Sequence, residues 1–321
     1  MKTVKRPWLA FENCLGPVIL FSSFAGLVSC FFVSWYSWWV IALFFLLGIA
    51  RWYFLGIIGV SVGYHRLLAH HLEKKAPFKT SSVMKSVFAI LGIMAFISPP
   101  NAWTAAHRQH HARSDGEGDP HSPVHGYTGH FAKLRGFFNV QIGAFFKKSA
   151  LSNYQKTIPD LLRDPAVQFV EKTKWVWIFA GVALPAVIGG AITWSILGIV
   201  WHGMFLGVLT LLASTFILHQ LINSVNSYSH MFGVQRFPTN DNSKNVSGVI
   251  GWILCFFNGG EPNQNSHHYF PWSARLVLPG DHGIDLGWPA LKFLKKLGHI
   301  WDLKEPTLAQ IRAAELTRNT A

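Results

Sequence analysis

Four apolar stretches, arranged as two closely spaced pairs, constrain this chain more than any other feature. The first pair covers 16–36 and 38–62, and the second covers 175–196 and 198–222. Each stretch has about 20 residues, the length that an α-helix needs to cross a hydrocarbon core of roughly 30 Å. The connection within each pair is too short for a domain, so the sequence predicts two helical hairpins. The expected fold is an all-α integral membrane protein with four transmembrane helices.

Basic residues lie on one side of these predicted spans. Of the 28 Lys and Arg residues, only Arg51 lies within a span, and none lies in the turn of either hairpin. Because basic residues accumulate on the cytoplasmic side, we expect both termini and the segments 63–174 and 223–321 in the cytoplasm, forming one domain over 1–321. Arg51 is expected to have a structural role, either in an ion pair or by snorkelling.

The formal net charge of +13 raises the question of nucleic acid as a partner. The composition argues against it, because half of the residues are hydrophobic, only 13% are charged, and the chain contains 14 Trp and 26 Phe. These features indicate a lipid bilayer and no nucleic acid. The apolar segments 84–97 and 131–151 are expected to form interfacial helices beside a cytoplasmic helical cap, and 305–321 is expected to form a solvent-exposed helix.

Histidines form three clusters on the predicted cytoplasmic side. They are His65 with His70 in an HxxxxH spacing, His107 with His110 and His111 in an HxxHH spacing, and His267 with His268 after Gln264. Positions i, i+3 and i+4 of an α-helix share a face, so the HxxHH group presents three imidazoles in one direction. The HxxxxH pair lies about 140° apart on an ideal helix and needs a helix end or local unwinding to converge. His230 lies just past the fourth span, with Asn226 one turn earlier on the same face.

Eight imidazoles on one face exceed what a single four- to six-coordinate ion requires, so they predict two metal ions. Imidazole suits zinc, iron and copper. An oxygen-activating di-iron centre accounts for the number of ligands and for their place beside lipid. Histidines outside this set, such as His71 and His219, are assigned ordinary hydrogen-bonding roles.

These clusters resemble the three histidine boxes of the membrane fatty acid desaturases, most of all the bacterial acyl-CoA, stearoyl-type delta-9 branch. The similar segments are 65–70, 107–111 and 260–271, with further similarity at 119–121, 223–230 and 301–304. The resemblance implies two iron ions, with Asn226 reaching one of them through water, and these histidine ligands: His65, His70, His107, His110, His111, His230, His267 and His268. Gln264 stands where this branch usually has histidine, and its amide oxygen is a weaker ligand than imidazole.

The resemblance further implies an O₂-dependent oxidoreductase in a bacterial inner membrane, with its active site on the cytoplasmic side. Its substrate is expected to be a long acyl chain, desaturated at delta-9, on coenzyme A, a carrier protein or a lipid. An unactivated methylene has no acidic proton and no polarised bond, so its oxidation requires a metal-bound oxidant. The sequence has no GxGxxG fingerprint in a strand–turn–helix context, so a separate electron donor of the cytochrome b5, ferredoxin or rubredoxin type is expected.

Two other functions remain open at this point. A di-iron membrane hydroxylase of a lipid or hydrocarbon would use the same centre, but would return oxygen to the substrate. A metal transporter or haem protein would need ligands near the middle of the bilayer, or paired axial histidines within the spans. Only His202 and His219 lie inside the predicted spans.

Overall fold

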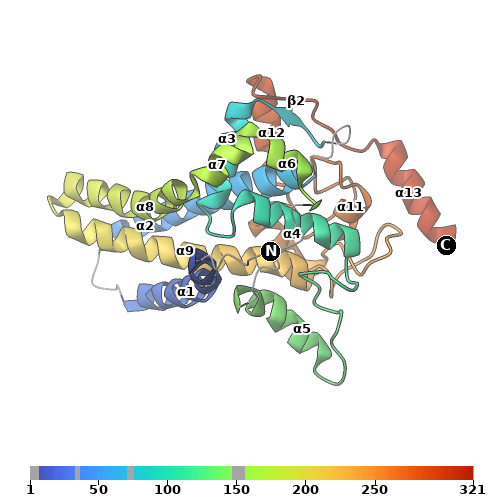
Figure 1. Ribbon diagram of the computed structural model, residues 1–321, viewed down its shortest axis with the longest axis horizontal. Helices are drawn as coiled ribbons and strands as arrows, with labels where there is room; N and C mark the ends of the chain where they lie inside the picture. The colour runs from blue at the N-terminus through green and yellow to red at the C-terminus, as the bar shows by residue number, and fades with distance from the viewer. Residues whose placement is uncertain (1–6, 33–36, 71–75, 147–155, 321) are drawn as a thin grey trace.

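A computed structural model describes residues 7–32, 37–70, 76–146 and 156–320 of the chain, and these residues are mostly helical (Figure 1). Four long helices extend together from one side of the molecule, and shorter helices form a cap at the other (Figure 1). The long helices are α1 (Pro7–Ser29), α2 (Trp38–Arg51), α8 (Lys174–Leu197) and α9 (Val200–Tyr228). Helix α2 continues directly into η2 (Trp52–Ala69), which is wound as a π-helix, with hydrogen bonds between residues i and i+5.

The cap is built from short elements. Its helices are α3 (Ser82–Ile93), α4 (Pro100–Arg113), α5 (Ala132–Gln141), α6 (Pro159–Arg163), α7 (Pro165–Lys172), α10 (Gly248–Phe257), α11 (Gln264–Tyr269), α12 (Gly287–Lys296) and α13 (Leu308–Thr320), with short 3₁₀ turns at Cys30–Phe32 (η1) and Gly143–Phe146 (η4). Two short antiparallel strands, β1 (Lys79–Thr80) and β2 (Ile300–Trp301), join the start of the cap to its end.

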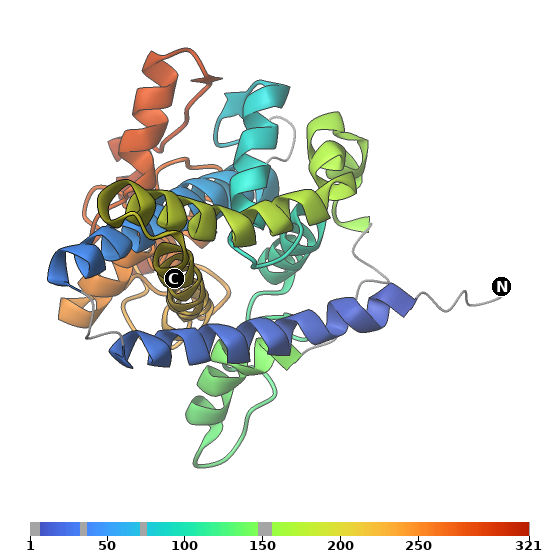
Figure 2. The same ribbon diagram turned by 90° about the vertical axis from the view of Figure 1, so that its left-hand side faces the viewer.

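Three helices are long and apolar enough to cross a membrane. They cover Trp38–Ala69, Lys174–Leu197 and Val200–Tyr228, and they correspond to the predicted spans 38–62, 175–196 and 198–222. The predicted span 16–36 differs. Its described part is a shorter apolar helix over Gly16–Phe32, which lies against α9 (Figure 2), and residues 33–36 fall outside the described residues. The structure therefore supports three of the four predicted spans.

The hairpin of α8 and α9 depends on very close contact between the two backbones. A Cβ atom on Gly203 would lie 2.0 Å from the carbonyl oxygen of Gly189, so only glycine fits. Gly198 closes α8 with a φ of 68°, a conformation that favours glycine. The Thr193 hydroxyl donates a 2.6 Å hydrogen bond to the Ile199 carbonyl across the turn. Small residues of this kind allow membrane helices to pack through van der Waals contact.

Arg51 lies inside the first of the three spans and contacts α9. Its Nε donates to Ser214 Oγ at 3.0 Å, and its Nη2 lies 3.5 Å from Thr215 Oγ1. No carboxylate of the described residues pairs with it, so the predicted ion pair is replaced by two hydroxyl partners. The structural role expected from the sequence takes this form, a polar link between α2 and α9.

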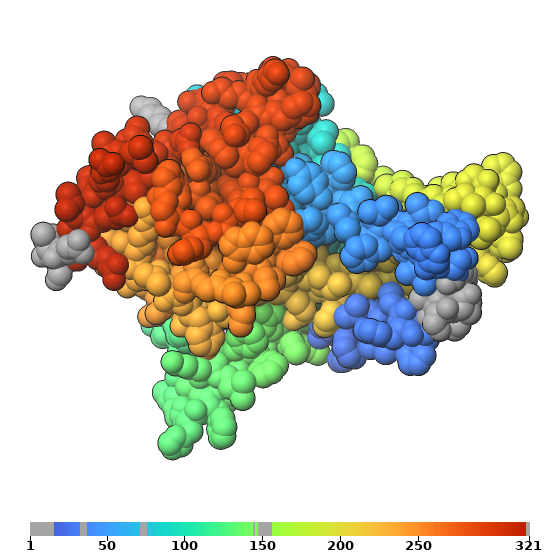
Figure 3. All heavy atoms as spheres, turned by 180° about the vertical axis from the view of Figure 1, so that it is seen from behind, coloured from blue at the N-terminus to red at the C-terminus, as the bar shows by residue number. Residues whose placement is uncertain are grey.

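The predicted interfacial segments have two distinct environments. Helix α3 packs on η2, where Phe88 and Ile93 are buried, while Val83 and Val87 remain exposed. Helix α5 projects from the body of the molecule (Figure 3) and has an exposed apolar face that includes Phe138. The segment 84–97 is therefore mostly buried or half-buried, with Val87 as its exposed residue, whereas 131–146 has the amphipathic character expected at an interface. Residues 147–151 fall outside the described part of the chain.

The predicted helix 305–321 forms as α13 over Leu308–Thr320. Most of its described side chains are exposed, but Ile311 and Ala314 are buried against Phe237 and Leu278. This contact and the pairing of β1 with β2 fix the C-terminal region to the cap.

Candidate metal centre

The three predicted histidine clusters and His230 converge where η2, α4, α9 and α11 meet. Their ring nitrogens form two compact groups, in each of which the ligand atoms lie within 4.8 Å of one another. The five-histidine group contains His65, His70, His107, His111 and His267, and the three-histidine group contains His110, His230 and His268. Adjacent histidines separate between the groups, because successive residues of a helix point about 100° apart.

The five-histidine group has ring nitrogens at metal-ligand spacing. His267 Nε2 lies 2.9 Å from His65 Nε2 and 3.0 Å from His111 Nε2, and His70 Nε2 lies 3.0 Å from His107 Nε2. One ring nitrogen carries either one hydrogen or one lone pair, so His267 Nε2 can make a hydrogen bond with only one of its two neighbours. A cation would satisfy all of these lone pairs. Two nitrogens at right angles, about 2.1 Å from an ion, would be about 3.0 Å apart.

The π-helical winding of η2 explains how the HxxxxH pair converges. The backbone N–H of His70 donates to the His65 carbonyl at 3.3 Å, a bond between residues i and i+5. The five-residue interval therefore closes one turn and brings both rings to one side, with their centroids 4.9 Å apart. π-helical turns are rare in proteins and occur frequently at functional sites.

In the three-histidine group, a carboxylate orients every ring. Nδ1 lies close to a carboxylate oxygen in His110 with Asp119 at 3.0 Å, in His230 with Asp115 at 2.8 Å, and in His268 with Asp241 at 2.5 Å. The opposite Nε2 atoms of all three rings are buried and have no hydrogen-bond partner. A carboxylate on Nδ1 fixes the tautomer that leaves Nε2 as a lone-pair donor, which is the arrangement of a metal-ligating histidine.

The carboxylates are themselves held in place by backbone groups. Asp119 accepts hydrogen bonds from the backbone N–H groups of Asp115 and His121, both at 2.8 Å, and Asp115 accepts one from Asn242 at 2.9 Å. Burial raises the pKa of Asp119, but the hydrogen bonds outweigh it and leave the pKa at about 2. The pKa values of Asp115 and Asp241 are lowered by the same balance. All three aspartates are therefore anionic at neutral pH.

Burial favours the neutral form of five of these histidines. It lowers the pKa values of His70, His107, His111 and His267 well below the ordinary range, and neighbouring histidines lower them further. Burial lowers the pKa of His268 to about 4, against the opposing hydrogen bond to Asp241. A metal binds only the deprotonated imidazole, so these five rings are in the required form at pH 7.

The two arginines inside the histidine motifs anchor the elements that carry the ligands. Arg66 is buried and forms a two-point contact with Asp285, and it also donates to Ser61 Oγ and to the carbonyl oxygens of Gly259 and Ala274. Arg108 forms a similar contact with Asp160 and donates to backbone carbonyls of η2. Neither guanidinium belongs to the histidine groups.

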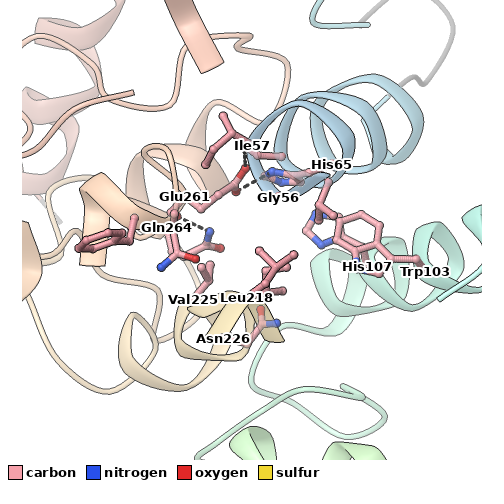
Figure 4. Close-up of a pocket in the computed structure, with 15 residues that line it drawn as sticks. Gly56, Ile57, His65, Trp103, His107, Leu218, Val225, Asn226, Glu261 and Gln264 are labelled. Carbon is pink, nitrogen blue, oxygen red and sulfur yellow. Dashed lines mark hydrogen bonds and ion pairs between the residues drawn. The ribbon is translucent and has the colours of Figure 1, made fainter. Parts of the chain in front are cut away.

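A pocket between η2, α4, α9 and α11 opens beside His65 and His107 (Figure 4). Its walls are apolar away from the histidines and polar close to them. The lining residues are Gly56, Ile57, Val60, Ser61, His65, Trp103, His107, Leu218, Ile222, Val225, Asn226, Phe257, Asn258, Glu261 and Gln264. Trp103 stacks on the His107 ring, with centroids 5.0 Å apart. The pocket thus combines apolar side chains with two rings of the five-histidine group, His65 and His107.

Two polar residues predicted for the centre, Asn226 and Gln264, both line this pocket. Gln264 shares a face of α11 with His268, four residues later, and its Nε2 donates to the Glu261 carbonyl at 2.7 Å. Glu261 also holds His65, with Oε2 2.7 Å from Nδ1, and accepts a short hydrogen bond from Ser61. The structure thus gathers the eight predicted histidines into two neighbouring groups, and it places Asn226 and Gln264 in the pocket that His65 and His107 also line.

Sequence reasoning missed the carboxylate partners of the histidines. Asp119 and Glu261 lie in segments that carry the family resemblance, so a signal for them was present. Asp115 reaches His230 across 115 positions and Asp241 reaches His268 across 27, and no spacing rule connects such residues. His219 lies outside both histidine groups. Its Nε2 is 3.1 Å from the Ala95 carbonyl oxygen, which agrees with the ordinary hydrogen-bonding role predicted for it. His71 falls outside the described residues.

Comparison with known proteins identifies close similarity over most of the chain. Residues 36–296 match the sequence profile described as fatty acid desaturase. The hex-5-enoyl-[acyl-carrier protein] acetylenase of Moorena producens is 37% identical over 82% of this chain and 77% of its own length. Delta-9 acyl-lipid desaturase 1 of Arabidopsis thaliana is 32% identical over 83% and 77%, respectively. The acyl-CoA C20 Delta5-desaturase of Anemone leveillei is 31% identical over 95% and 87%.

Proposed function

Because this chain belongs to the fatty acid desaturase family, we propose that it introduces a double bond into a long acyl chain, using O₂ and two iron ions. The single observation that carries the proposal is the pair of neighbouring histidine groups, the larger of which meets a mainly apolar pocket at His65 and His107. Side-chain acid or base chemistry cannot attack an unactivated methylene, so a pocket for such a group needs an oxidising metal centre beside it.

The residues present fit two iron ions. Imidazole is a suitable ligand for iron, and three ring nitrogens of the second group are buried without any other partner. The five-histidine group would hold one ion and the three-histidine group the other, with Asn226 contributing through water and Gln264 through its amide oxygen. When bound, the iron pair supplies the O₂-dependent oxidation of the methylene groups. The carboxylates beside His65, His110, His230 and His268 would keep the Nε2 atoms of these four rings deprotonated and correctly aimed.

The pocket would position the acyl chain. Ile57, Val60, Leu218 and Ile222 offer apolar walls, which would hold methylene groups and exclude water from them. The polar residues Ser61, Glu261 and Asn258 occur among the lining residues, so the pocket combines an apolar holding surface with hydrogen-bonding groups beside His65. A methylene held beside His65 and His107 would be the one oxidised.

We propose that the substrate is an acyl thioester of coenzyme A or a related carrier and that the double bond is introduced at delta-9. Relatives named as acting on acyl-lipid, acyl-CoA and acyl-carrier-protein substrates support an acyl substrate in general. Electrons would come from a separate donor protein of the cytochrome b5, ferredoxin or rubredoxin type. In this proposal the chain is one domain with four spans, in a bacterial inner membrane, and both termini and the iron site face the cytoplasm.

The test is expression in a bacterial host with a simple lipid profile, followed by mass spectrometric location of double bonds in the extracted fatty acids. We expect new monounsaturated chains with the double bond at delta-9, which disappear in His110→Ala. Mainly hydroxylated chains with no alkene would instead identify the hydroxylase alternative. Because one relative is named an acetylenase, the same analysis should be run for triple bonds after feeding unsaturated chains. Unchanged lipids with a loaded, folded protein would contradict the proposal.

A further inference from the structure

The two histidine groups differ in the charge that surrounds them. In the three-histidine group every ring has a carboxylate at its Nδ1, supplied by Asp115, Asp119 and Asp241. In the five-histidine group, Glu261 at His65 is the one carboxylate within ion-pair distance of any ring among the described residues. Three anionic partners therefore face three imidazoles on one side, and one faces five on the other.

The neighbouring arginines do not remove this difference. Arg66 lies close to Glu261, because both bind the Ser61 hydroxyl, but its charge is matched by Asp285 at 2.8 Å. Arg108 lies behind His70, and its charge is matched by Asp160 at 2.6 Å. The surroundings of the five-histidine group thus add one net negative charge.

Among the described residues, no lysine or arginine pairs with the aspartates of the three-histidine group. Apart from the histidines, their partners are backbone N–H groups and hydroxyls, for example Ser243, whose backbone N–H donates to Asp241 at 3.0 Å, and Ser122, whose hydroxyl donates to Asp115 at 3.0 Å. Hydrogen bonds from N–H groups hold a carboxylate in its charged form without cancelling the charge. Three negative charges therefore remain directly behind three ligand rings.

We propose that this asymmetry makes the two metal positions unequal, so that the three-histidine group holds the ion of higher charge and the five-histidine group the ion of lower charge. A carboxylate on Nδ1 increases the basicity of the ligating imidazole, and its charge stabilises a trivalent ion more than a divalent one. When a ferric pair accepts one electron from an external one-electron donor, one Fe³⁺ becomes Fe²⁺, and the electron resides at the five-histidine group. Asp115, Asp119 and Asp241 are positioning residues that also set this order. The inference rests on the proposed di-iron function.

The experiment uses full-length protein loaded with ⁵⁷Fe and reduced electrochemically in two one-electron steps, with Mössbauer spectra recorded after each. Asp241→Asn keeps the shape of the side chain and removes its charge at the three-histidine group. Glu261→Gln is the matched change at the five-histidine group. We expect Asp241→Asn to alter the ferric signal of the half-reduced protein and raise the midpoint potential of the second step. Glu261→Gln should alter the ferrous signal and raise that of the first step.

Further variants keep the result interpretable. Asp119→Asn acts on His110 and should repeat the effect of Asp241→Asn if the latter does not fold, while the surface change Asp302→Asn should leave both potentials unchanged. Two results would overturn this inference and leave the proposed di-iron function standing. One is a change in midpoint potential confined to the first reduction step in the aspartate variants, and the other is two irons with identical Mössbauer signals after one electron. Fewer than two irons per chain at saturating iron would instead count against the proposed di-iron function.

Discussion

The membrane helices and the cap are held together in opposite ways. In the hairpin of α8 and α9, glycines such as Gly189 and Gly203 bring two backbones into contact, and few polar groups take part. In the cap, arginines bridge elements that are distant in sequence: Arg66, buried near the end of η2, pairs with Asp285, and the half-buried Arg236 pairs with Asp281. Lipid is as apolar as a helix surface, so helices associate there through close packing and a few interhelical hydrogen bonds such as that of Arg51 with Ser214. In the cap, ion pairs such as these hold the segments that carry the histidines.

The histidine groups lie at the boundary between these two regions. His65 and His230 come from the ends of the membrane helices, whereas His110 and His267 come from short cap helices. A centre built this way requires both kinds of packing at once. We therefore expect a substitution in the cap to lower both stability and metal content, and a substitution in the hairpin of α8 and α9 to lower stability alone.

The largest effect is expected where the two regions meet. His110→Ala removes a ligand ring and leaves Asp119 without its histidine partner. We expect activity to fall below detection and iron to fall from about two to about one per chain, while the protein stays in the membrane. Membrane fractionation, iron analysis and product analysis measure the three quantities. Undiminished activity would show that His110 is not a ligand.

The second effect tests the charge network of the cap. Arg66→Met removes a buried guanidinium and leaves Asp285 buried without its partner, which should cost about 3–5 kcal/mol of stability and lower iron content. Thermal unfolding of the purified protein measures it. Lys79→Met breaks an exposed ion pair with Asp302 and serves as the control, with an expected cost of about 0–1 kcal/mol. Equal costs for the two variants would contradict the role given to Arg66.

Acid should act on the cap and leave the membrane helices intact. The pKa of His268 is about 4 in the folded protein, below its ordinary value near 6.5, so the unfolded chain binds more protons between these values. The metal-free protein should therefore have its full stability above pH 6.5 and lose it as the pH falls toward 4. Each such histidine contributes up to about 1.4 kcal/mol per pH unit. Circular dichroism and tryptophan fluorescence against pH should show a partial loss of helix as the cap unfolds, while the long helices are retained.

A change in the membrane half should lower stability without lowering metal content. Gly203→Val places a side chain against the Gly189 carbonyl and should cost about 1–3 kcal/mol by overpacking. Val208→Leu, at an exposed position of the same helix, is the control and should have little effect. Iron content and thermal unfolding are measured together. Loss of iron in Gly203→Val at a temperature where the protein remains folded would break the separation of the two regions.

The smallest effect is expected at Gln264. A histidine at this position would offer imidazole in place of an amide on the same face of α11 as His268. We expect Gln264→His to be tolerated, with both irons retained and activity within about tenfold of the parent. Iron release in the presence of a chelator compares the two proteins. Loss of both irons would show that the space around Gln264 fits only an amide.

The helical architecture and the membrane character could be predicted from sequence, because length and hydropathy act locally. The histidine motifs were accessible too, although the three rings predicted to share one face divide: His107 and His111 join one group and His110 joins the other. The partners of these rings were not accessible. Asp115 and Asp241 lie in loops, and their places depend on how distant segments pack. The convergence of His65 with His70 depends on the winding of η2, which no apolar pattern reveals.

The positions of the histidines along the chain determine when, during synthesis, each histidine group can be complete. Both histidine groups include a residue from α11, His267 in one and His268 in the other, so neither is complete until most of the chain has left the ribosome. The segments that carry His65 and His107 are synthesised much earlier than α11, which supplies a histidine to each group. If the chain holds the proposed iron pair, a complete site for either ion would form only after the long helices have been synthesised.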